Sequence, residues 1–459
     1  MIKLDLQKIS GAEVLPIIEG GKGISISTGE TCGAWAAAGG VGTFSAVNAD
    51  SYDENSNVIR QIYHGETRLK RRQELIDYAV AGGIAQAKIA REKSNGKGRI
   101  HMNVLWEMGA CEEILTKILE GAKKCIHGIV CGAGMPYNLG EIASKFGVYY
   151  YPIVSSARAF SALFRRSYQK RQNFLGGVVY EDPWLAGGHN GLSNAEDPLQ
   201  PANPYLRIVE LRKIMDSFAL QTIPIIIAGG VWWLSEWEDY IHNKELGLTA
   251  FQFGTRSILT LECPVAKSWQ PKLMSLKKGE VKLTQLSPTG FYSSAINNKM
   301  LNDLLELQNR QVKIVKDSPL KVVTASGREI NVDVDQSERI TSWIEDGFSA
   351  AMLTPSDTVV FVTPEQSKQI LNDQKNCCCC LSACRFSSWC QQKGSTGKIP
   401  DPRSFCIQKS LQAVAHDGDL DNNLMFAGHS AYRFSEDPFY ANSFIPTTKQ
   451  LIDRIVTGY

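Results

Sequence analysis

The hydrophobic positions of this chain fall into short, β-branched runs that end in or near glycine. Such runs are typical of strands buried on both faces of a parallel sheet. Eight of them predict strands: VLPIIEG near Val14, GVGTFS near Gly40, RIHMNVL from Arg99, CIHGIVCG from Cys125, GVYYYPIV from Gly147, FLGGVVY from Phe174, IPIIIAGG from Ile223 and LTAFQFG from Leu248.

Stretches with apolar residues at helical spacing lie between these runs, the clearest at 67–93, 111–124 and 203–219. Eight alternating units over roughly 260 residues match a (β/α)8 TIM barrel in both number and length. A doubly wound open sheet is the main rival, but it usually carries a glycine fingerprint after its first strand. GGKGIS at Gly20 is a poor version of that fingerprint. The pattern therefore favours an α/β barrel.

The chain continues well beyond the eighth strand. We expect the barrel to occupy residues 1–300 and a C-terminal helical cap with a cysteine cluster to occupy residues 301–459. SPTGFYSSAINN and the helix-like NKMLNDLLELQNRQVKIV follow the eighth strand. They are expected to close the barrel and to lead into the cap.

Composition narrows the classes of partner. The 49 lysine and arginine residues nearly balance 47 acids, which gives no sign of a nucleic-acid or membrane-surface partner. MIKLDLQKIS has no apolar signal region, and IPIIIAGGVWWL is too short to span a bilayer. We therefore expect a cytoplasmic protein whose 12 cysteines are mostly thiols unless they are ligated.

Glycine-rich strand ends point to an anion site. In a barrel the loops after strands seven and eight often form a phosphate site, because bare backbone N–H groups can surround an anion. Gly229 and Gly230 close the seventh predicted strand, and Gly254 with Thr255 closes the eighth. Paired glycines can also serve only as tight turns, but two pairs at the right two strands favour a phosphate.

AGGHNG brings His189 to the rim of the sixth strand, where barrel catalysis occurs. Gly187 and Gly188 would let a flat ligand approach the backbone. A lone histidine is more often structural or solvated, yet this position favours a catalytic role. His101 and His127 fall in predicted strands and are expected to pack there, and His429 is expected to lie well beyond the barrel.

NCCCCLSACRFSSWC in the tail is dense in cysteine. Cys377, Cys380 and Cys384 have a C-x2-C-x3-C spacing close to that of zinc or iron–sulfur ligands, with Cys406 or Cys390 as a fourth. The alternative is a set of free thiols that pack as small hydrophobes. So dense a cluster is an oxidation hazard without a ligand, which favours a zinc or iron–sulfur site.

The motifs IIEGGKGIS, AAAGGVGTFS, MNVL, CGAGMP, LAGGHNG, IPIIIAGGV and FQFGTRSILTLE follow one another in the order found in the nitronate monooxygenase family, formerly called 2-nitropropane dioxygenases. From about Pro16 to Cys263 the chain resembles that family, and its long tail resembles a bacterial subgroup. The same superfamily includes flavin-dependent enoyl-acyl-carrier-protein reductases and NADH:quinone reductases.

The resemblance implies an FMN-binding barrel and assigns roles to matching positions. The loop of Gly20, Gly21 and Lys22 would pass along the isoalloxazine, and Asn103 would hydrogen-bond the flavin or its ribityl chain. Further positions implied to hold the cofactor are Gly187, Gly188, Gly229, Gly230, Gln252, Gly254 and Thr255. His189 matches the histidine that faces the flavin and handles the substrate proton.

Two positions depart from the family pattern. Leu185 stands where the family commonly has glutamate, and Glu181 or Asp182 is a substitute from the same loop. Glu19-Gly20-Gly21 stands where a Pro-Met pair is usual.

The function that the resemblance implies is oxidation of alkyl nitronates with O2. The alternative is an NAD(P)H-dependent flavin reductase that acts on enoyl thioesters or quinones, since the cofactor does the hard chemistry in both. A flavin-binding protein without activity and a barrel that binds a phosphate ligand without flavin also stay open. The expected partners are a small-molecule substrate with O2 or NAD(P)H, and homo-oligomerisation stays open.

Overall fold

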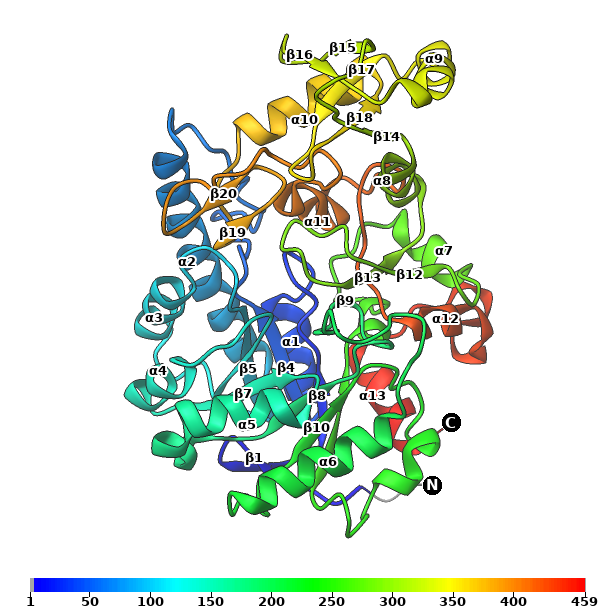
Figure 1. Cartoon of the computed structure of the whole chain (residues 1–459). Helices are drawn as coiled ribbons and strands as arrows, with labels where there is room; N and C mark the ends of the chain where they lie inside the picture. The colour runs from blue at the N-terminus through cyan, green and yellow to red at the C-terminus, as the bar shows by residue number, and fades with distance from the viewer. Residues whose placement is uncertain (1–3, 459) are drawn as a thin grey trace.

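In a computed structural model, which describes residues 4–458, eight parallel strands close into a barrel (Figure 1). All eight predicted strands are present. Around the barrel the order is β3 (Ile17–Glu19), β4 (Val41–Ser45), β5 (Arg99–Leu105), β6 (Gly128–Gly132), β7 (Tyr149–Val154), β8 (Val178–Glu181), β10 (Ile225–Ala228) and β11 (Thr249–Phe253), which pairs back to β3. The TIM-barrel prediction is confirmed.

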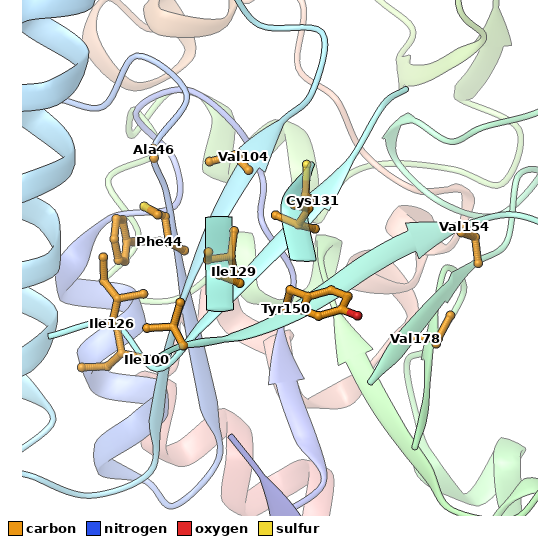
Figure 2. Packing of buried hydrophobic residues seen from close by; sticks show 14 of the residues in the cluster. Phe44, Ala46, Ile100, Val104, Ile126, Ile129, Cys131, Tyr150, Val154 and Val178 are labelled. Carbon is orange, nitrogen blue, oxygen red and sulfur yellow. The ribbon is translucent and has the colours of Figure 1, made fainter. Parts of the chain in front are cut away.

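Alternate residues of each strand face inward and outward, as the pleat requires. In β10, Ile226 belongs to the apolar cluster inside the barrel, whereas Ile225 and Ile227 belong to the larger cluster between the strands and the surrounding helices. Figure 2 shows part of this outer layer, with Ile129 and Tyr150 on neighbouring strands. Both faces of the strands are therefore buried, which explains their nearly continuous apolar sequence.

Helices surround the strands where the sequence supplies caps and an apolar face. At the start of the helix 68–93, the Thr67 side chain accepts a hydrogen bond from the backbone N–H of Lys70. At the start of the helix 204–217, the Asn203 side chain accepts one from the backbone N–H of Tyr205, and Pro204 occupies the first helical position. The helices that follow barrel strands are α1 (Gly29–Ala37), α2 (Arg68–Lys93), α3 (Cys111–Gly121), α4 (Leu139–Phe146), α5 (Ala157–Arg166) and α6 (Pro204–Ser217). The three clearest predicted helices are thus confirmed.

The seventh and eighth units are irregular. A kinked 3-10 helix, Leu234–Tyr240, follows β10, and a single 3-10 turn, Thr255–Ile258, follows β11. The last helix of the chain, α13 (Thr448–Thr457), packs against α1 and buries Leu451 in the same apolar cluster as the barrel strands. The chain leaves the barrel after β11 and returns to it at its last helix.

A hairpin of β1 (Gln7–Ile9) and β2 (Ala12–Val14) lies against the end of the barrel where its strands begin. The Ser10 hydroxyl lies 2.9 Å from Nε2 of His101 and 2.6 Å from the Tyr151 hydroxyl, and both of these residues are buried in the barrel. The expectation that His101 packs in a strand is confirmed.

The segment after β11 builds a cap of short elements over the opposite end of the barrel. β12 (Val281–Thr284) and β13 (Ser293–Ile296) form an antiparallel sheet with β9 (Gly188–His189). The remaining elements are α7 (Trp269–Met274), α8 (Lys299–Asn309), β14 (Gln311–Lys313), β15 (Lys321–Val323), β16 (Glu329–Asn331), α9 (Ser337–Glu345), β17 (Ala350–Leu353), β18 (Thr358–Val362), α10 (Pro364–Lys375), β19 (Ala383–Cys384), β20 (Trp389–Cys390), α11 (Ile407–His416) and α12 (Arg433–Glu436).

The cap is less helical than the sequence suggests. The helix expected through Val315 ends at Asn309, and its last part is β14, which pairs with β18 in a three-stranded sheet with an apolar cluster of its own. This small sheet lies in the part of the cap away from the barrel, next to β15, β16 and α9 (Figure 1). The division at residue 300 stays a prediction, and α13 is the part of the tail that joins the barrel layer.

Candidate active site

A cavity lies between the carboxyl ends of the barrel strands and the cap, lined by residues of both. The predicted site residues all line it: Gly20, Gly21, Lys22, Asn103, Gly187, Gly188, His189, Gly229, Gly230, Gln252, Gly254 and Thr255. Their roles remain proposals, but the structure brings all twelve positions to one cavity.

His189 is presented to the cavity by a strand of the cap sheet. It pairs with Ser293 where β9 runs alongside β13. The rings of His189 and Phe426 pack edge to face, with 5.4 Å between their centroids. Its Nε2 atom lies 2.6 Å from the Ser287 hydroxyl. Burial lowers the pKa of His189 to about 4, so the imidazole is neutral at pH 7.

Lys22 is buried and paired rather than solvated. Its Nζ atom donates to a carboxylate oxygen of Glu19 at 2.5 Å and to the Ser257 hydroxyl at 3.1 Å. The other Glu19 oxygen accepts the backbone N–H of Thr43. Because Glu19 balances its charge, Lys22 brings little net positive charge to the cavity.

Glycine is required on the first loop because a side chain there would strike its neighbours. A Cβ atom at Gly21 would lie 2.3 Å from Cγ of Asn103, and a Cβ at Gly20 would lie 3.1 Å from Cα of Gly254. At Gly254 itself a Cβ would meet nothing within 4 Å. The loop after β3 is thus packed against β5 and β11, while Gly254 borders open space.

The ends of β10 and β11 offer free backbone donors. Gly229 and Gly230 have φ of +91° and +78°, a left-handed conformation that favours glycine. Among the hydrogen bonds between residues 4–458, none is donated by the backbone N–H of Gly229, Gly230 or Gly254. These three half-buried glycines line the cavity, and backbone donors without a protein partner fit an anionic ligand such as the phosphate of FMN.

Glu181 ends β8 and also lines the cavity. Burial, together with the neighbouring Asp182, raises its pKa to about 8. Asp182 is used differently, because its carboxylate accepts the backbone N–H groups of Trp184 at 3.0 Å and Leu185 at 2.9 Å. The loop that carries Leu185 is therefore held by Asp182, whereas the Glu181 carboxyl has no such role in the loop and lines the cavity.

The tail closes the cavity, which sequence reasoning missed. Its lining includes Cys380, Leu381, Ile407, Leu411, Phe426, Ala427, Gly428 and Ser430. His429, which was expected to lie well beyond the barrel, has its Nε2 3.2 Å from the Ser294 hydroxyl, and its backbone N–H donates to the carbonyl of Leu185. That expectation is wrong. The FAGHS motif is similar to AGGHNG, and this similarity was the signal in the sequence that His429 lies near the cavity.

In the described part of the chain, the cysteine cluster is not arranged as a metal-ligand set. No group of three or more His, Cys, Asp or Glu side chains among the described residues is placed to hold a metal ion. Cys377 accepts hydrogen bonds from the Ser387 hydroxyl at 3.1 Å and from the backbone N–H of Cys379. Cys380 and Cys384 pack among apolar side chains in the cap core. The binding of zinc or an iron–sulfur cluster by Cys377, Cys380, Cys384 and Cys406 stays a prediction that this arrangement does not support.

Similar solved structures share this fold at low sequence identity. FabK from Thermotoga maritima is 15% identical with a TM-score of 0.54, over 100% of this chain and 96% of that one. The enoyl reductase domain of MlnA from the macrolactin biosynthesis cluster of Bacillus amyloliquefaciens is 12% identical with a TM-score of 0.51, over 96% and 93%. No curated protein matches the sequence.

A nitroalkane oxidase from Streptomyces ansochromogenes is more distant, with 13% identity and a TM-score of 0.44 over 63% of this chain and 79% of that one. No helix among residues 4–458 is long and apolar enough to cross a membrane. The family model for nitronate monooxygenase matches residues 5–458. The chain belongs to the nitronate monooxygenase family of oxidoreductase enzymes.

Proposed function

We propose that this protein is an FMN-dependent oxidoreductase that oxidises alkyl nitronates with O2 in the cytoplasm. The observation that carries the proposal is the position of His189, which faces a glycine-lined cavity at the carboxyl ends of the barrel strands. Family membership supports the same reaction class. When bound, FMN supplies the two-electron oxidation of the substrate carbon and the transfer of electrons to O2.

The cavity offers FMN two kinds of contact. The free N–H groups at Gly229, Gly230 and Gly254 suit its phosphate, and the side chains of Asn103 and Gln252 suit the polar atoms of the ribityl chain or the ring. Gly20 and Gly21 would let the planar ring approach the backbone.

The protein contributes a shielded space for a small substrate beside His189. A neutral imidazole fixed by Ser287 offers a hydrogen bond without adding charge, which suits the orientation of a nitro or nitronate group. Phe426 on the ring of His189 excludes water from that side.

Anaerobic stopped-flow absorbance of the purified, FMN-loaded protein tests the proposal. The protein is mixed in turn with an alkyl nitronate, NADPH and NADH, and bleaching of the flavin bands is followed. We expect rapid bleaching by the nitronate and no bleaching by either nicotinamide. A colourless preparation that fails to bind added FMN would contradict the cofactor assignment.

Bleaching by a nicotinamide alone would move the assignment to the second candidate, an NAD(P)H-dependent reductase of enoyl thioesters or quinones. The specific observation in favour of this candidate is the shared fold with the enoyl reductase domain of MlnA over nearly the whole chain. A neutral nitroalkane must lose its α-proton before it becomes a nitronate, and reduction of an enoyl thioester must supply a proton at the substrate carbon.

A further inference from the structure

Glu181 is a cavity carboxyl without a partner. Within the described part of the chain, no side chain or backbone N–H donates a hydrogen bond to it, and no lysine, arginine or histidine pairs with it within 4.0 Å. The part of its side chain that remains accessible lies on the cavity. A half-buried carboxyl on the cavity wall, with no partner in the protein, is free to contact a ligand.

Its surroundings disfavour a negative charge. Of the flanking strands, β10 carries no titratable side chain, and the residues of β7 opposite the end of β8 are Ile153 and Val154. Asp182, the next residue, adds a like charge that raises the pKa of Glu181 further. Burial raises the pKa of Asp182 itself, whereas Arg207 lowers it and so favours the charged form of Asp182.

The charged groups across the cavity do not offset this effect. Lys22 is paired with Glu19, and His189 is neutral at pH 7. Glu181 is therefore protonated at pH 7 and ionised above pH 8, since its pKa is raised to about 8. A group that titrates near neutrality is a better proton carrier than an imidazole whose pKa is about 4.

We propose that Glu181 is the proton-carrying residue of this cavity: ionised, it takes the α-proton of a neutral nitroalkane, and protonated, it leaves the cavity uncharged for an anionic nitronate. This inference rests on the proposed function. In the first reaction the α C–H bond breaks, its electron pair moves into a C=N bond, and the nitro group becomes the anionic nitronate. The proton forms an O–H bond on Glu181 and later passes to solvent.

The first test needs neither flavin nor substrate. The free energy of unfolding is measured in urea from pH 5 to pH 9 for the wild type, Glu181→Gln and a matched control, Glu120→Gln, whose side chain is exposed on α3. Because the folded-state pKa of Glu181 is raised, its contribution to stability is full below pH 4.5 and is lost as the pH rises through about 8.

Glu181→Gln should therefore gain stability relative to the wild type above pH 8 and match it near pH 5, whereas the control should follow the wild type throughout. Glu181→Asp keeps a carboxyl and should keep the loss at high pH. Parallel curves for the wild type and Glu181→Gln would overturn the proposal.

The second test uses FMN-loaded protein under anaerobic conditions. With a neutral nitroalkane, flavin reduction by the wild type should rise with pH up to about 8, and Glu181→Gln should be slower by about a hundredfold or more, the size of a typical proton-transfer contribution. With a preformed nitronate, flavin reduction by the wild type should slow above pH 8, where Glu181 is ionised and repels the anionic substrate, and Glu181→Gln should not show this slowing.

The outcomes separate the two proposals. If the wild type reduces its flavin with both nitro compounds and Glu181→Gln retains the nitroalkane rate, the proposed function stands and the role of Glu181 is overturned. If neither nitro compound reduces the wild-type flavin although the stability difference at high pH is present, the proposed function fails, and the nitroalkane role of Glu181 fails with it.

Discussion

At the scale of single residues, the His189 ring is held by contacts that come from distant parts of the chain. Ser287, 98 positions later, contributes the hydroxyl at 2.6 Å from Nε2, and the Thr289 hydroxyl lies 2.9 Å from the same Ser287 oxygen. This small network sets the orientation of the imidazole toward the cavity.

Ser287→Ala removes that hydrogen bond and frees the ring. One hydrogen bond contributes about 0.5–1.5 kcal/mol, so we expect kcat to fall by up to about tenfold with little change in the unfolding midpoint. Steady-state kinetics with an alkyl nitronate measure the effect. Ser275→Ala, whose hydroxyl donates only to the carbonyl of Lys272, is the control; an equal loss in both variants would exclude a role in orientation.

Gly21→Ala and Gly254→Ala distinguish a glycine required for packing within the protein from a glycine required to leave room for a ligand. The added methyl at Gly21 strikes Asn103, so this variant should lose both thermal stability and FMN affinity. The methyl at Gly254 meets no protein atom, and its φ of −89° suits alanine, so stability should hold while FMN affinity falls. Differential scanning fluorimetry and flavin fluorescence titration give the two readouts; unchanged affinity in Gly254→Ala would contradict the placement of the phosphate.

At the scale of elements, α13 completes the helical layer that the short turns after β10 and β11 leave open. Its first turn is fixed by Glu262, whose carboxylate accepts the backbone N–H and the hydroxyl of Thr448. Nearby, a buried pair between Arg256 and Asp437 joins the end of β11 to the segment before α13. The helix at the end of the tail is therefore a structural part of the barrel.

Leu451→Ala in α13 should destabilise the whole barrel. Leu451 is fully buried, and truncation of such a residue costs about 2–5 kcal/mol through lost burial and the cavity that remains. Urea unfolding should show a lower midpoint in one cooperative transition. Ile344→Ala, at a side chain 47% exposed in α9, is the matched control and should change stability by less than about 0.5 kcal/mol. A normal midpoint for Leu451→Ala would show that α13 is dispensable.

The thermal stability of the protein should depend on the packing of the cysteine cluster and not on a bound metal ion. Treatment with EDTA and a thiol-compatible zinc chelator should leave the thermal midpoint unchanged, because the thiols do not form a ligand set. Cys379→Ala, which removes a fully buried side chain from the apolar cluster of the cap, should lower the midpoint. A chelator-dependent drop accompanied by stoichiometric zinc release would contradict this expectation.

The sequence foretold the barrel far better than the cap. Buried parallel strands such as Ile225–Ala228 are continuous apolar runs, and their order alone implies closure. Phe426 contacts His189, and Cys380 lines the same cavity as Asn103, although the members of each pair lie more than 200 positions apart in the sequence. No local sequence pattern encodes such contacts. The free carboxyl of Glu181 was also hidden, because burial and missing partners are properties of the folded chain.

At the scale of the whole molecule, three histidines make stability depend on pH. Burial lowers the pKa of His101 to about 3 and those of His127 and His189 to about 4. Between these values and the ordinary histidine pKa of about 6.5 the unfolded chain binds more protons than the folded one. Their contribution to stability is present above pH 6.5 and is lost as the pH falls toward 4.

The free energy of unfolding should therefore fall progressively as the pH is lowered from 6.5 to 4.5. Urea titrations at half-unit steps measure the slope. His127→Gln removes one of the three sites and should make the slope shallower. A profile that is flat across this interval in the wild type would contradict the burial of the neutral imidazoles.

The late position of the cap in the chain has a consequence for biosynthesis. The barrel strands are complete at Phe253, yet the wall of the cavity that contains Phe426 and Ser430 is translated more than 170 codons later. A barrel emerging from the ribosome is open at its carboxyl ends and still lacks α13. A ligand of the cavity can therefore be enclosed only after Ser430 has been translated, and chains that stop before this point present an unshielded apolar rim to the quality-control machinery.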